Sequence, residues 1–337
     1  MRAIRIREPG GPEVLELVER DDPVAAAGEV RVRVRCAGIN RADLLQRMGR
    51  YPAPADAPPD IPGLEFAGEI ETVGTGVAGW SAGDRVMGIL GGGGYGERVT
   101  VPAGQLLPVP PTLSWTEAGA IPEVFLTAAD ALVERGRLRS GECVLVHTAG
   151  GGVGTAALQL ARAAGAGSII ATASADKLRR LREAGLPHDL AVDRRAGSFA
   201  DAIAQHTARA GADVILDTVG APYWEANMAS LATLGRLVIV GVMGGMKVEA
   251  DLRQLMGKRA TVVGTVLRAR SKAEKATLTE MFATRFLPGF TAPEGDPSHL
   301  RPVIDRVFPL AEAAEAHRHV ESNRSFGKVL LDLATDF

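Results

Sequence analysis

Hydrophobic and polar residues alternate along the first part of the chain. Between residues 29 and 39, Val30, Val32 and Val34 alternate with arginines, and this two-residue period is typical of a strand with one buried face. Similar short apolar runs, separated by clusters of Gly and Pro, occupy residues 1–7, 14–20, 66–74, 84–90 and 96–103. Short strands divided by turn residues predict a mostly antiparallel, barrel-like domain.

The spacing of the apolar runs changes after about residue 120. Strand-like runs now alternate with amphipathic stretches long enough to form helices. The expected strands are 144–149, 168–173, 189–193, 212–218, 236–241 and 260–267, with helices expected at 152–165, 175–185, 198–211 and 223–235. This alternation predicts an α/β unit of the Rossmann type, a doubly wound parallel sheet.

The last part of the chain does not continue this alternation. It contains two expected helices, near 272–287 and 310–321, and a final strand at 327–333. We therefore expect the chain to return and complete the first domain, which makes the nucleotide-binding unit an insertion. The expected parts are a catalytic domain at 1–120, a Rossmann domain at 121–268 and a return segment at 269–337.

Composition and charge narrow the choice of partners and compartment. The 337 residues are 46% hydrophobic and 23% charged, with a formal net charge of -2, so no excess of positive charge attracts the chain to nucleic acid. The first residues lack the apolar core of a signal peptide, and no segment offers the roughly 18 apolar residues of a membrane span. We expect a cytoplasmic protein, with no membrane contact, whose Cys36 and Cys143 stay reduced.

A glycine-rich turn follows the first strand of the Rossmann unit. Ala149, Gly151 and Gly154 form an A-x-G-x-x-G pattern directly before a helix. Small residues allow a tight turn and a close approach of the backbone to a pyrophosphate, while the first N–H groups of the helix, including those of Gly152 and Val153, remain available to it. The position of the pattern between a strand and a helix predicts a dinucleotide site.

The end of the second Rossmann strand indicates which dinucleotide is bound. An Asp or Glu at this point would bond the ribose 2′-hydroxyl of NAD, but Ala173 and Ser174 stand here instead. Ser174 and Lys177 supply a hydroxyl and a cation for a 2′-phosphate, whereas Asp176 is expected in the first helical turn, where an acid interacts well with the helix dipole. We therefore expect NADPH rather than NADH.

The whole chain resembles a known family. The resemblance rests on NRADLLQRMGRYP, PGLEFAGEIETVG, AIPEVFLTAADAL, AGGGVGTAALQLARAAGA, ILDTVGAPYWEANMASLATLGRLVIVGVMGG and NRSFGKVLL. These segments are similar to zinc-independent quinone oxidoreductases of the medium-chain dehydrogenase/reductase superfamily, and within them to the p53-inducible quinone oxidoreductases and their bacterial relatives. The resemblance implies a GroES-like β-barrel catalytic domain beside the Rossmann domain, NADPH-dependent reduction of quinones, and a homodimer.

The resemblance also implies an enzyme without a metal. In zinc-dependent relatives a Cys-His pair and a later Gly-His-Glu supply ligands, and the matching positions here hold Asn40, Arg41 and Leu64. A catalytic zinc needs three protein ligands. Other candidates do not supply them: Cys36 lies on the preceding strand, and the paired histidines of the last helix, His317 and His319, are two residues apart and so face different directions.

The resemblance also implies roles for individual residues of this chain. Tyr51 is expected to line the nicotinamide and substrate pocket, where its phenol can donate to a carbonyl or stack on a quinone, and Asn40 lines the same pocket. Asp43 is expected to orient this loop through a backbone or Arg contact. Cofactor contacts are implied for Val240, Gly241, Met243, Gly244, Leu267 and Asn323.

One departure from the relatives counts against NADPH. Asp193 stands where some relatives place a tyrosine beside the 2′-phosphate, although Arg194 and Arg195 follow it directly. His147, at the end of the first Rossmann strand, is expected to be buried and hydrogen-bonded rather than catalytic.

Three functions remain open at this point. The first is an NADPH-dependent reductase of quinones; the second is a reductase of enones or enoyl thioesters, because the same scaffold can deliver hydride to a carbon β to a carbonyl. The third, of another class, is a redox-inactive NADPH-binding structural protein. For all three, the apolar strand at 260–267 would lie at an edge of the sheet, where pairing across a two-fold axis would cover it.

Overall fold

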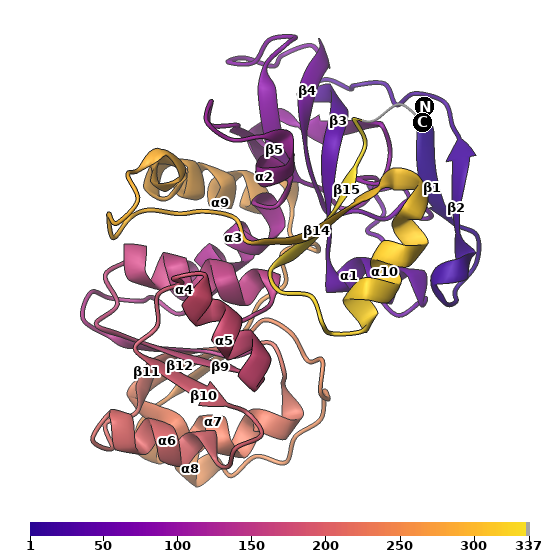
Figure 1. Cartoon of the computed structure of the whole chain (residues 1–337). Helices are drawn as coiled ribbons and strands as arrows, with labels where there is room; N and C mark the ends of the chain where they lie inside the picture. Colours follow the sequence, from indigo (N-terminus) through magenta and orange to yellow (C-terminus); the bar gives the residue numbers. More distant parts are fainter. Residues whose placement is uncertain (335–337) are drawn as a thin grey trace. The chain divides into compact units, whose positions relative to one another are not determined.

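The computed structural model describes residues 1–334 and divides into two compact units. Unit 1 consists of residues 1–126, 267–291 and 301–337, and unit 2 of residues 127–266 and 292–300. The first unit therefore contains segments from both ends of the chain, as Figure 1 shows by the indigo and yellow strands of a single sheet. No helix within the described residues is long and apolar enough to cross a membrane.

Unit 1 is built around a seven-stranded, mostly antiparallel sheet with the order β14-β15-β3-β4-β5-β7, in which β6 also pairs with β3. The two strands β1 and β2 form a separate ribbon. The strands are β1 (Arg2–Ile6), β2 (Leu15–Glu19), β3 (Glu29–Ile39), β4 (Glu65–Val73), β5 (Arg85–Ile89), β6 (Arg98–Pro102), β7 (Leu106–Pro108), β14 (Ile304–Pro309) and β15 (Lys328–Asp332). The return of β14 and β15 to this sheet follows from the apolar final run of the chain.

The alternation that predicted β3 corresponds to its two faces. Val30, Val32 and Val34 are at most 1% exposed and belong to the apolar core of the unit. Arg31 and Arg33, on the opposite face, both contact Glu71 of β4. The helices of this unit are α1 (Arg41–Arg47), α2 (Trp115–Gly119), α9 (Lys272–Arg285), α10 (Ala313–Glu321) and the first part of α3 (Pro122–Ala129).

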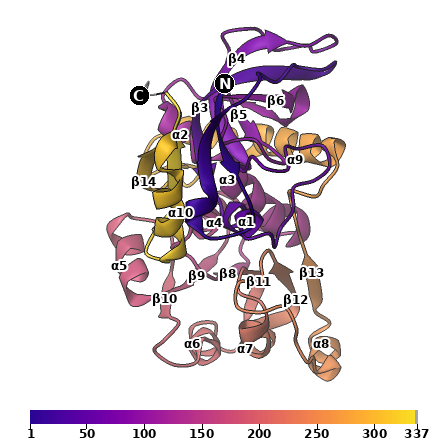
Figure 2. The ribbon, with the colours of Figure 1, turned by 90° about the vertical axis from the view of Figure 1, so that its right-hand side faces the viewer.

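Unit 2 is a parallel six-stranded sheet with the order β10-β9-β8-β11-β12-β13, which is the doubly wound order of dinucleotide-binding folds. Figures 1 and 2 show α4 and α5 on one face of this sheet and α6 and α7 on the other. Its strands are β8 (Cys143–Val146), β9 (Ser168–Ala173), β10 (Leu190–Asp193), β11 (Ala212–Asp217), β12 (Leu231–Ile239) and β13 (Thr261–Gly264). Its helices are α4 (Gly152–Ala163), α5 (Ala175–Glu183), α6 (Phe199–His206), α7 (Trp224–Ser230) and α8 (Leu252–Lys258), with a π-helical segment at Asp130–Arg135.

The prediction was wrong at the junction of α7 and β12. The helix was expected to continue to residue 235, but it ends at Ser230 and the strand starts at once with Leu231. Ala212 of β11 lies opposite Leu231 while Val214 lies opposite Arg236, so an irregular stretch separates two paired parts of β12. Leu234 has a φ of 64° in this stretch. With no turn residues between helix and strand, the apolar Leu231 and Ala232 resembled the last turn of an amphipathic helix.

Other elements were missing from the prediction. The stretch expected as a loop after β3 contains α1, and the segment after β12 contains α8. The strands β7 and β14 were also missed, because each is short or carries charged residues in place of an apolar run.

Candidate functional site

The glycine loop of unit 2, residues 149–154, connects β8 to α4. The N–H of Ala149 donates to the carbonyl of Thr172 on β9, and Gly151 is the N-cap residue of α4. Within residues 1–334, no protein acceptor takes the N–H groups of Gly152, Val153 and Gly154. These three donors at the start of a helix fit a bound phosphate group.

Close packing makes glycine necessary at two positions of the loop. A β-carbon at Gly154 would lie 2.4 Å from the carbonyl oxygen of Thr148 and 2.6 Å from Cα of Ala149. A β-carbon at Gly150 would lie 2.8 Å from Cβ of Lys177 and 2.9 Å from its Cδ. The alkyl chain of Lys177 therefore runs over Gly150, so the cation predicted to bind a 2′-phosphate belongs to a side chain in contact with the glycine loop.

Charged residues surround the ends of β9 and β10. Ser174 is the N-cap of α5, and Asp176 pairs with Arg179 at 2.7 Å, as expected of an acid in a first helical turn. The carboxylate of Asp193 accepts the N–H of Arg195. Arg194 donates its N–H to the carbonyl of Ala173, which places it at the end of β9.

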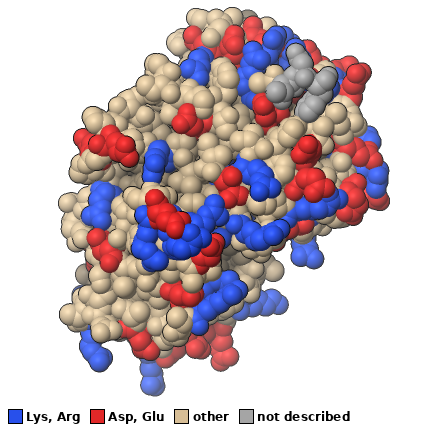
Figure 3. Space-filling model, in the orientation of Figure 1, with Lys and Arg blue, Asp and Glu red and all other residues tan. Residues whose placement is uncertain are grey.

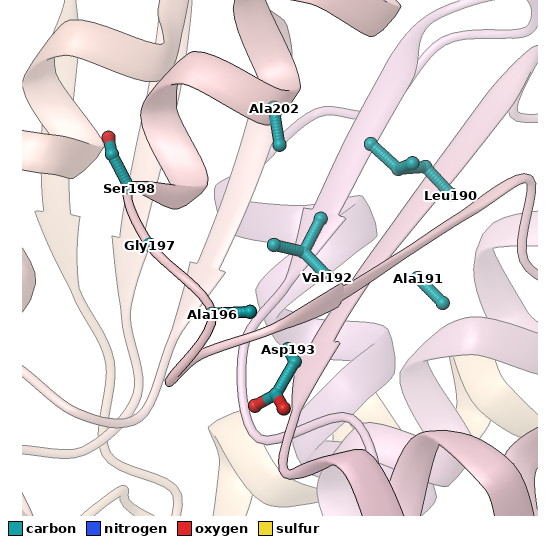
Figure 4. A pocket seen from close by; sticks show the side chains of 8 residues that line it. All are labelled: Leu190, Ala191, Val192, Asp193, Ala196, Gly197, Ser198 and Ala202. Carbon is teal, nitrogen blue, oxygen red and sulfur yellow. The ribbon is translucent and has the colours of Figure 1, made fainter.

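A small cavity opens beside β10. Its volume is about 250 Å³, and Figure 4 shows its lining of mostly small or aliphatic side chains. Asp193 supplies the carboxylate among them, while Ser198 lies at the start of α6. None of the residues predicted to bind the cofactor lines this cavity.

A buried neutral network lies below the glycine loop. His147 is 0% exposed; its Nδ1 is 2.7 Å from the hydroxyl oxygen of Thr172 and its Nε2 is 2.7 Å from Oδ1 of Asn227. Asn227 uses its amide N–H to donate to Asp217, so its Oδ1 accepts and the imidazole carries its proton on Nε2. Burial lowers the pKa of His147 to about 4. The structure therefore shows a buried, hydrogen-bonded His147, as the sequence predicted.

Asp217 links this network to the segment predicted to contact the nicotinamide. Its carboxylate accepts the N–H groups of Val219 and Gly220, and its carbonyl accepts those of Val240 and Gly241. The N–H of Met243 donates to the carbonyl of Thr218, and the N–H of Gly244 donates to the carbonyl of Val219. The structure thus brings the predicted residues 240–244 against the turn after β11. The sequence analysis missed Asn227 and Asp217; Asp217, as a polar residue that ends the apolar run of β11, could have been noticed, whereas Asn227 lies within α7.

In unit 1, the side chains of Asn40, Glu65 and Lys328 form an ion-pair cluster, in which Glu65 and Lys328 are buried. Lys328 Nζ donates to Glu65 Oε1 at 2.6 Å, Asn40 Oδ1 at 2.8 Å and the carbonyl of Ile39 at 2.9 Å. Glu65 Oε1 also accepts from the amide of Asn40 at 2.8 Å. Asn40, which was predicted to line the nicotinamide and substrate pocket, holds its amide in this cluster. All three donor sites of the ammonium group are used.

The Glu65 carboxylate also contacts α3 and lies against Gly38 of β3. Its Oε2 accepts the N–H of Glu123 in the first turn of α3 at 2.8 Å. A β-carbon at Gly38 would lie 2.1 Å from Glu65 Oε1, so the carboxylate occupies the space that any side chain at this position would need. The ion-pair cluster therefore fixes the ends of β3, β4 and β15 and the start of α3 at one point.

Tyr51 lies beside a second buried cation of unit 1. The guanidinium carbon of Arg268 is 5.1 Å from the centre of the Tyr51 ring. Arg268 also donates to Gln46 Oε1 at 2.7 Å, to the carbonyl of Gly91 and to that of Tyr51 itself. Burial raises the pKa of the half-buried Tyr51, and the charge of Arg268 offsets part of that rise. The preceding residue, Leu267, is buried.

The loop contact of Asp43 is with the backbone, one of the two alternatives expected. Its carboxylate accepts the N–H groups of Asn40 and Gly63 at 2.8 and 3.0 Å and lies 3.3 Å from the hydroxyl of Tyr95. Burial raises the pKa of Asp43 to about 6. Asn323, the last residue predicted to contact the cofactor, accepts from Arg41 at 2.7 Å.

Within the described residues, no group of three or more His, Cys, Asp or Glu side chains is placed to hold a metal ion. His317 contacts Tyr95 and Arg47, while His319 contacts Asp305 at 2.6 Å. Cys36 is buried and burial raises its pKa, which makes its thiol a poor source of thiolate. His317, His319 and Cys36 therefore lie in different environments within the described structure and are not grouped around one point.

Comparison with known proteins gives the same assignment as the motifs. Residues 26–111 match the family described as Alcohol dehydrogenase GroES-like domain, and residues 152–284 match Zinc-binding dehydrogenase. The chain is 33% identical to the Quinone oxidoreductase of Rattus norvegicus over 336 residues, which cover 98% of this chain and 97% of that protein.

Solved structures show the same fold over almost the whole chain. A mycobacterial protein complexed with NADPH has a TM-score of 0.84 and 30% identity, covering 98% of this chain and 100% of the other. An NAD-dependent alcohol dehydrogenase has a TM-score of 0.83 and 33% identity, covering 99% and 100%. The JamJ enoyl reductase has a TM-score of 0.84 and 27% identity, covering 98% of each chain. The chain belongs to the quinone oxidoreductase-like group of the medium-chain dehydrogenase/reductase superfamily, whose fold joins a GroES-like domain to a Rossmann domain, and is an oxidoreductase of that superfamily.

Proposed function

We propose that the protein is an NADPH-dependent quinone oxidoreductase that works without a metal. The observation that carries this proposal is the ion-pair cluster: Asn40 stands at a ligand position of the zinc-dependent relatives, and its amide is held by Glu65 and Lys328. Because these side chains are hydrogen-bonded to one another, they do not offer zinc a free set of ligands. Whole-chain similarity to a quinone oxidoreductase supports the choice of acceptor.

The cofactor proposal rests on the residues around the glycine loop. The N–H groups of Gly152, Val153 and Gly154 would hold the pyrophosphate, and Ser174 and Lys177 would hold the 2′-phosphate of NADPH. NADPH would supply the hydride. Tyr51, beside Arg268, would donate a hydrogen bond to the substrate oxygen or stack on the quinone ring.

A direct test compares both cofactors and several acceptors. Purified protein, treated with a chelator, is expected to oxidise NADPH with a simple quinone faster than it oxidises NADH. No oxidation with any quinone or conjugated carbonyl would contradict the proposal, and tight NADPH binding without turnover would favour a redox-inactive binding protein. Loss of activity after chelation, restored by zinc, would contradict the metal-free mechanism.

A second candidate function is reduction of a conjugated carbonyl, which the structural similarity to an enoyl reductase favours. The acceptor panel separates the two functions. Enoyl reduction requires a proton at the α-carbon, so Tyr51→Phe should lower turnover of an enoyl thioester or enone more than turnover of a quinone.

We also propose that the protein forms a homodimer through β13, which pairs only with β12 inside the described chain. Large apolar side chains are exposed over the same part of the sequence: Val242, Met243, Met246, Val248, Leu252, Met256 and Val266. An uncovered strand edge with exposed apolar neighbours favours pairing with a second copy. Sedimentation at micromolar concentration should show a dimer, and Met256→Glu, at a side chain that is 74% exposed, should shift it towards monomer.

A further inference from the structure

Arg268 is a buried cation that binds only neutral oxygen atoms. It is 5% exposed, and within residues 1–334 no carboxylate lies at ion-pair distance from it. Its guanidinium group donates instead to the carbonyls of Gly91 at 2.7 Å and Tyr51 at 3.3 Å, and to Oε1 of Gln46 at 2.7 Å. Because arginine stays charged even when it is buried, the positive charge acts on the groups beside it.

The guanidinium group holds Tyr51 at two points. Its Nη1 donates to the carbonyl of Tyr51, and its carbon lies 5.1 Å from the centre of the Tyr51 ring. The first contact fixes the backbone, and the second fixes the side chain through a cation–π interaction. Tyr51 is half-buried, so part of the residue remains accessible while it is held.

The same guanidinium group anchors the proline-rich segment that follows α1. Gln46 accepts from Arg268 through Oε1 and donates through Nε2 to the carbonyl of Pro59, at the far end of this segment, at 3.2 Å. The segment also packs on Gly91, where a β-carbon would lie 2.8 Å from Cγ of Pro54. Prolines have no N–H to donate, so these side-chain contacts replace backbone bonds that the segment cannot make.

We propose that Arg268 is a positioning residue of the reaction, which holds the phenol of Tyr51 towards the substrate and strengthens the hydrogen bond that the phenol donates. This inference rests on the proposed function, in which Tyr51 donates to the substrate oxygen. A cation close to the ring draws electron density from the phenol, so its O–H donates more strongly as negative charge develops on the substrate oxygen. Burial and the charge of Glu123 raise the pKa of Tyr51, and Arg268 opposes both.

A double-mutant cycle tests whether Arg268 acts through the phenol. Arg268→Met removes the charge and the donors, and kcat with a quinone should fall about tenfold while KM for NADPH stays within about twofold. In a Tyr51→Phe background the same substitution should change kcat by less than about twofold, because the hydrogen bond that it supports is already absent. An equal fall in both backgrounds, or no fall in either, would overturn the proposal.

A conservative variant separates positioning from loss of folding. Arg268→Lys keeps a buried cation but lacks the planar fork that reaches several oxygens at once, so kcat should fall only about threefold. This partial recovery should disappear in the Tyr51→Phe background. If Arg268→Met does not fold, the cycle with Arg268→Lys decides, and a lysine variant with the same kcat loss in both backgrounds would contradict the proposal.

Arg236→Met is the matched control for removal of a buried arginine. Arg236 also donates to two backbone carbonyls, those of Gly136 and Arg137, and its side chain is 14% exposed. The control should lower the midpoint of urea unfolding, as Arg268→Met does, and leave kcat unchanged. A kcat that follows stability in the same way in both variants would show that Arg268 is merely structural.

Failure of this inference can be told apart from failure of the proposed function. If the wild-type protein reduces no quinone or conjugated carbonyl with NADPH, the proposed function fails, and the role of Arg268 fails with it. If the wild type is active but Tyr51→Phe has the same kcat with a quinone, the phenol has no part in the reaction. The role of Arg268 is then overturned alone, and NADPH-dependent reduction stands.

Discussion

The glycine loop and the ion-pair cluster are opposite ways of making a site. The loop uses consecutive residues, 149–154, and presents backbone N–H groups. The cluster joins side chains that are far apart in sequence: Lys328 lies 263 residues from Glu65, and Asn40 lies 25 residues from it. A local turn with fixed spacing can be recognised from sequence, whereas a cluster that exists only after β3, β4 and β15 have paired cannot. The two sites are also stabilised by different interactions. The loop depends on close packing around its glycines, and the cluster depends on compensation of one buried charge by another.

The largest expected effect comes from breaking the ion-pair cluster. Lys328→Met removes the cation next to Glu65, which is 0% exposed. An uncompensated buried carboxylate should lower the free energy of unfolding by about 3–5 kcal/mol, measured by urea denaturation followed by tryptophan fluorescence. The double variant Glu65→Gln/Lys328→Met removes both charges and should recover part of this loss.

Lys272→Met is the matched control for the cluster. Its ammonium group pairs with Glu29 at 3.1 Å, and its side chain is 55% exposed. An exposed pair contributes at most about 1 kcal/mol. A Lys328→Met protein no less stable than this control would show that charge compensation is unimportant in the cluster.

A smaller effect should follow from filling the space above the glycine loop. In Gly154→Ala the new β-carbon meets backbone atoms at 2.4 and 2.6 Å, which cannot move aside as a side-chain tip can. Overpacking of this kind should cost about 1–3 kcal/mol, and NADPH affinity, measured by fluorescence titration, should fall at least about tenfold because the N–H donors shift. Gly257→Ala in α8, where a β-carbon meets nothing within 4 Å, should leave both quantities nearly unchanged or slightly raise stability.

These differences explain which parts of the protein could be predicted from sequence. The pattern of apolar residues predicted the strands of both sheets except β7 and β14, and β3 follows the period of two of a strand with one buried face. The same reasoning failed for α7 and β12, where helix and strand meet without turn residues at Leu231. Tertiary pairing with β11, rather than local preference, decides the start of that strand.

The candidate site could be predicted only in part from the sequence, for the same reason. The spacing of Gly151 and Gly154 and the absence of an acid at Ala173 are local facts, and the structure places Lys177 against this loop. Asn40 could be aligned with a zinc ligand by resemblance, but its partners Glu65 and Lys328 are set by β-sheet pairing. The contacts of Arg268 gave no signal in the sequence, since they form only once the chain has returned to unit 1.

The neutral network of unit 2 offers a contrast to the ion-pair cluster in its response to pH. Burial lowers the pKa of His147 to about 4, below the value of about 6.5 for an unfolded chain. Between these two values the unfolded state binds a proton that the folded state does not, so stability from His147 is present above pH 6.5 and is lost as pH falls towards 4. At pH 5 the loss should be about 2 kcal/mol relative to neutral pH.

The measurement is the change in unfolding free energy between pH 7 and pH 5. His147→Gln cannot take up this proton, so its change should be smaller than that of wild type by about 2 kcal/mol. His206→Gln, at an exposed position at the end of α6, should keep the wild-type change. Equal slopes for wild type and His147→Gln would show that His147 is not held neutral by its surroundings.

The smallest expected effect concerns Lys177, whose side chain lies on the glycine loop. Lys177→Glu reverses the charge on the chain that crosses Gly150, and it should weaken NADPH binding about tenfold, or about 1.4 kcal/mol, while binding of NADH changes little. Arg182→Glu, an exposed position further along α5, controls for charge reversal on the same helix and should preserve the preference for NADPH. If Lys177→Glu weakens both cofactors equally, the effect comes from disturbing the loop, and if it weakens neither, the 2′-phosphate is not held at Ser174 and Lys177. A selective loss of NADPH would show that a single side chain adds specificity to a site whose basic shape comes from backbone.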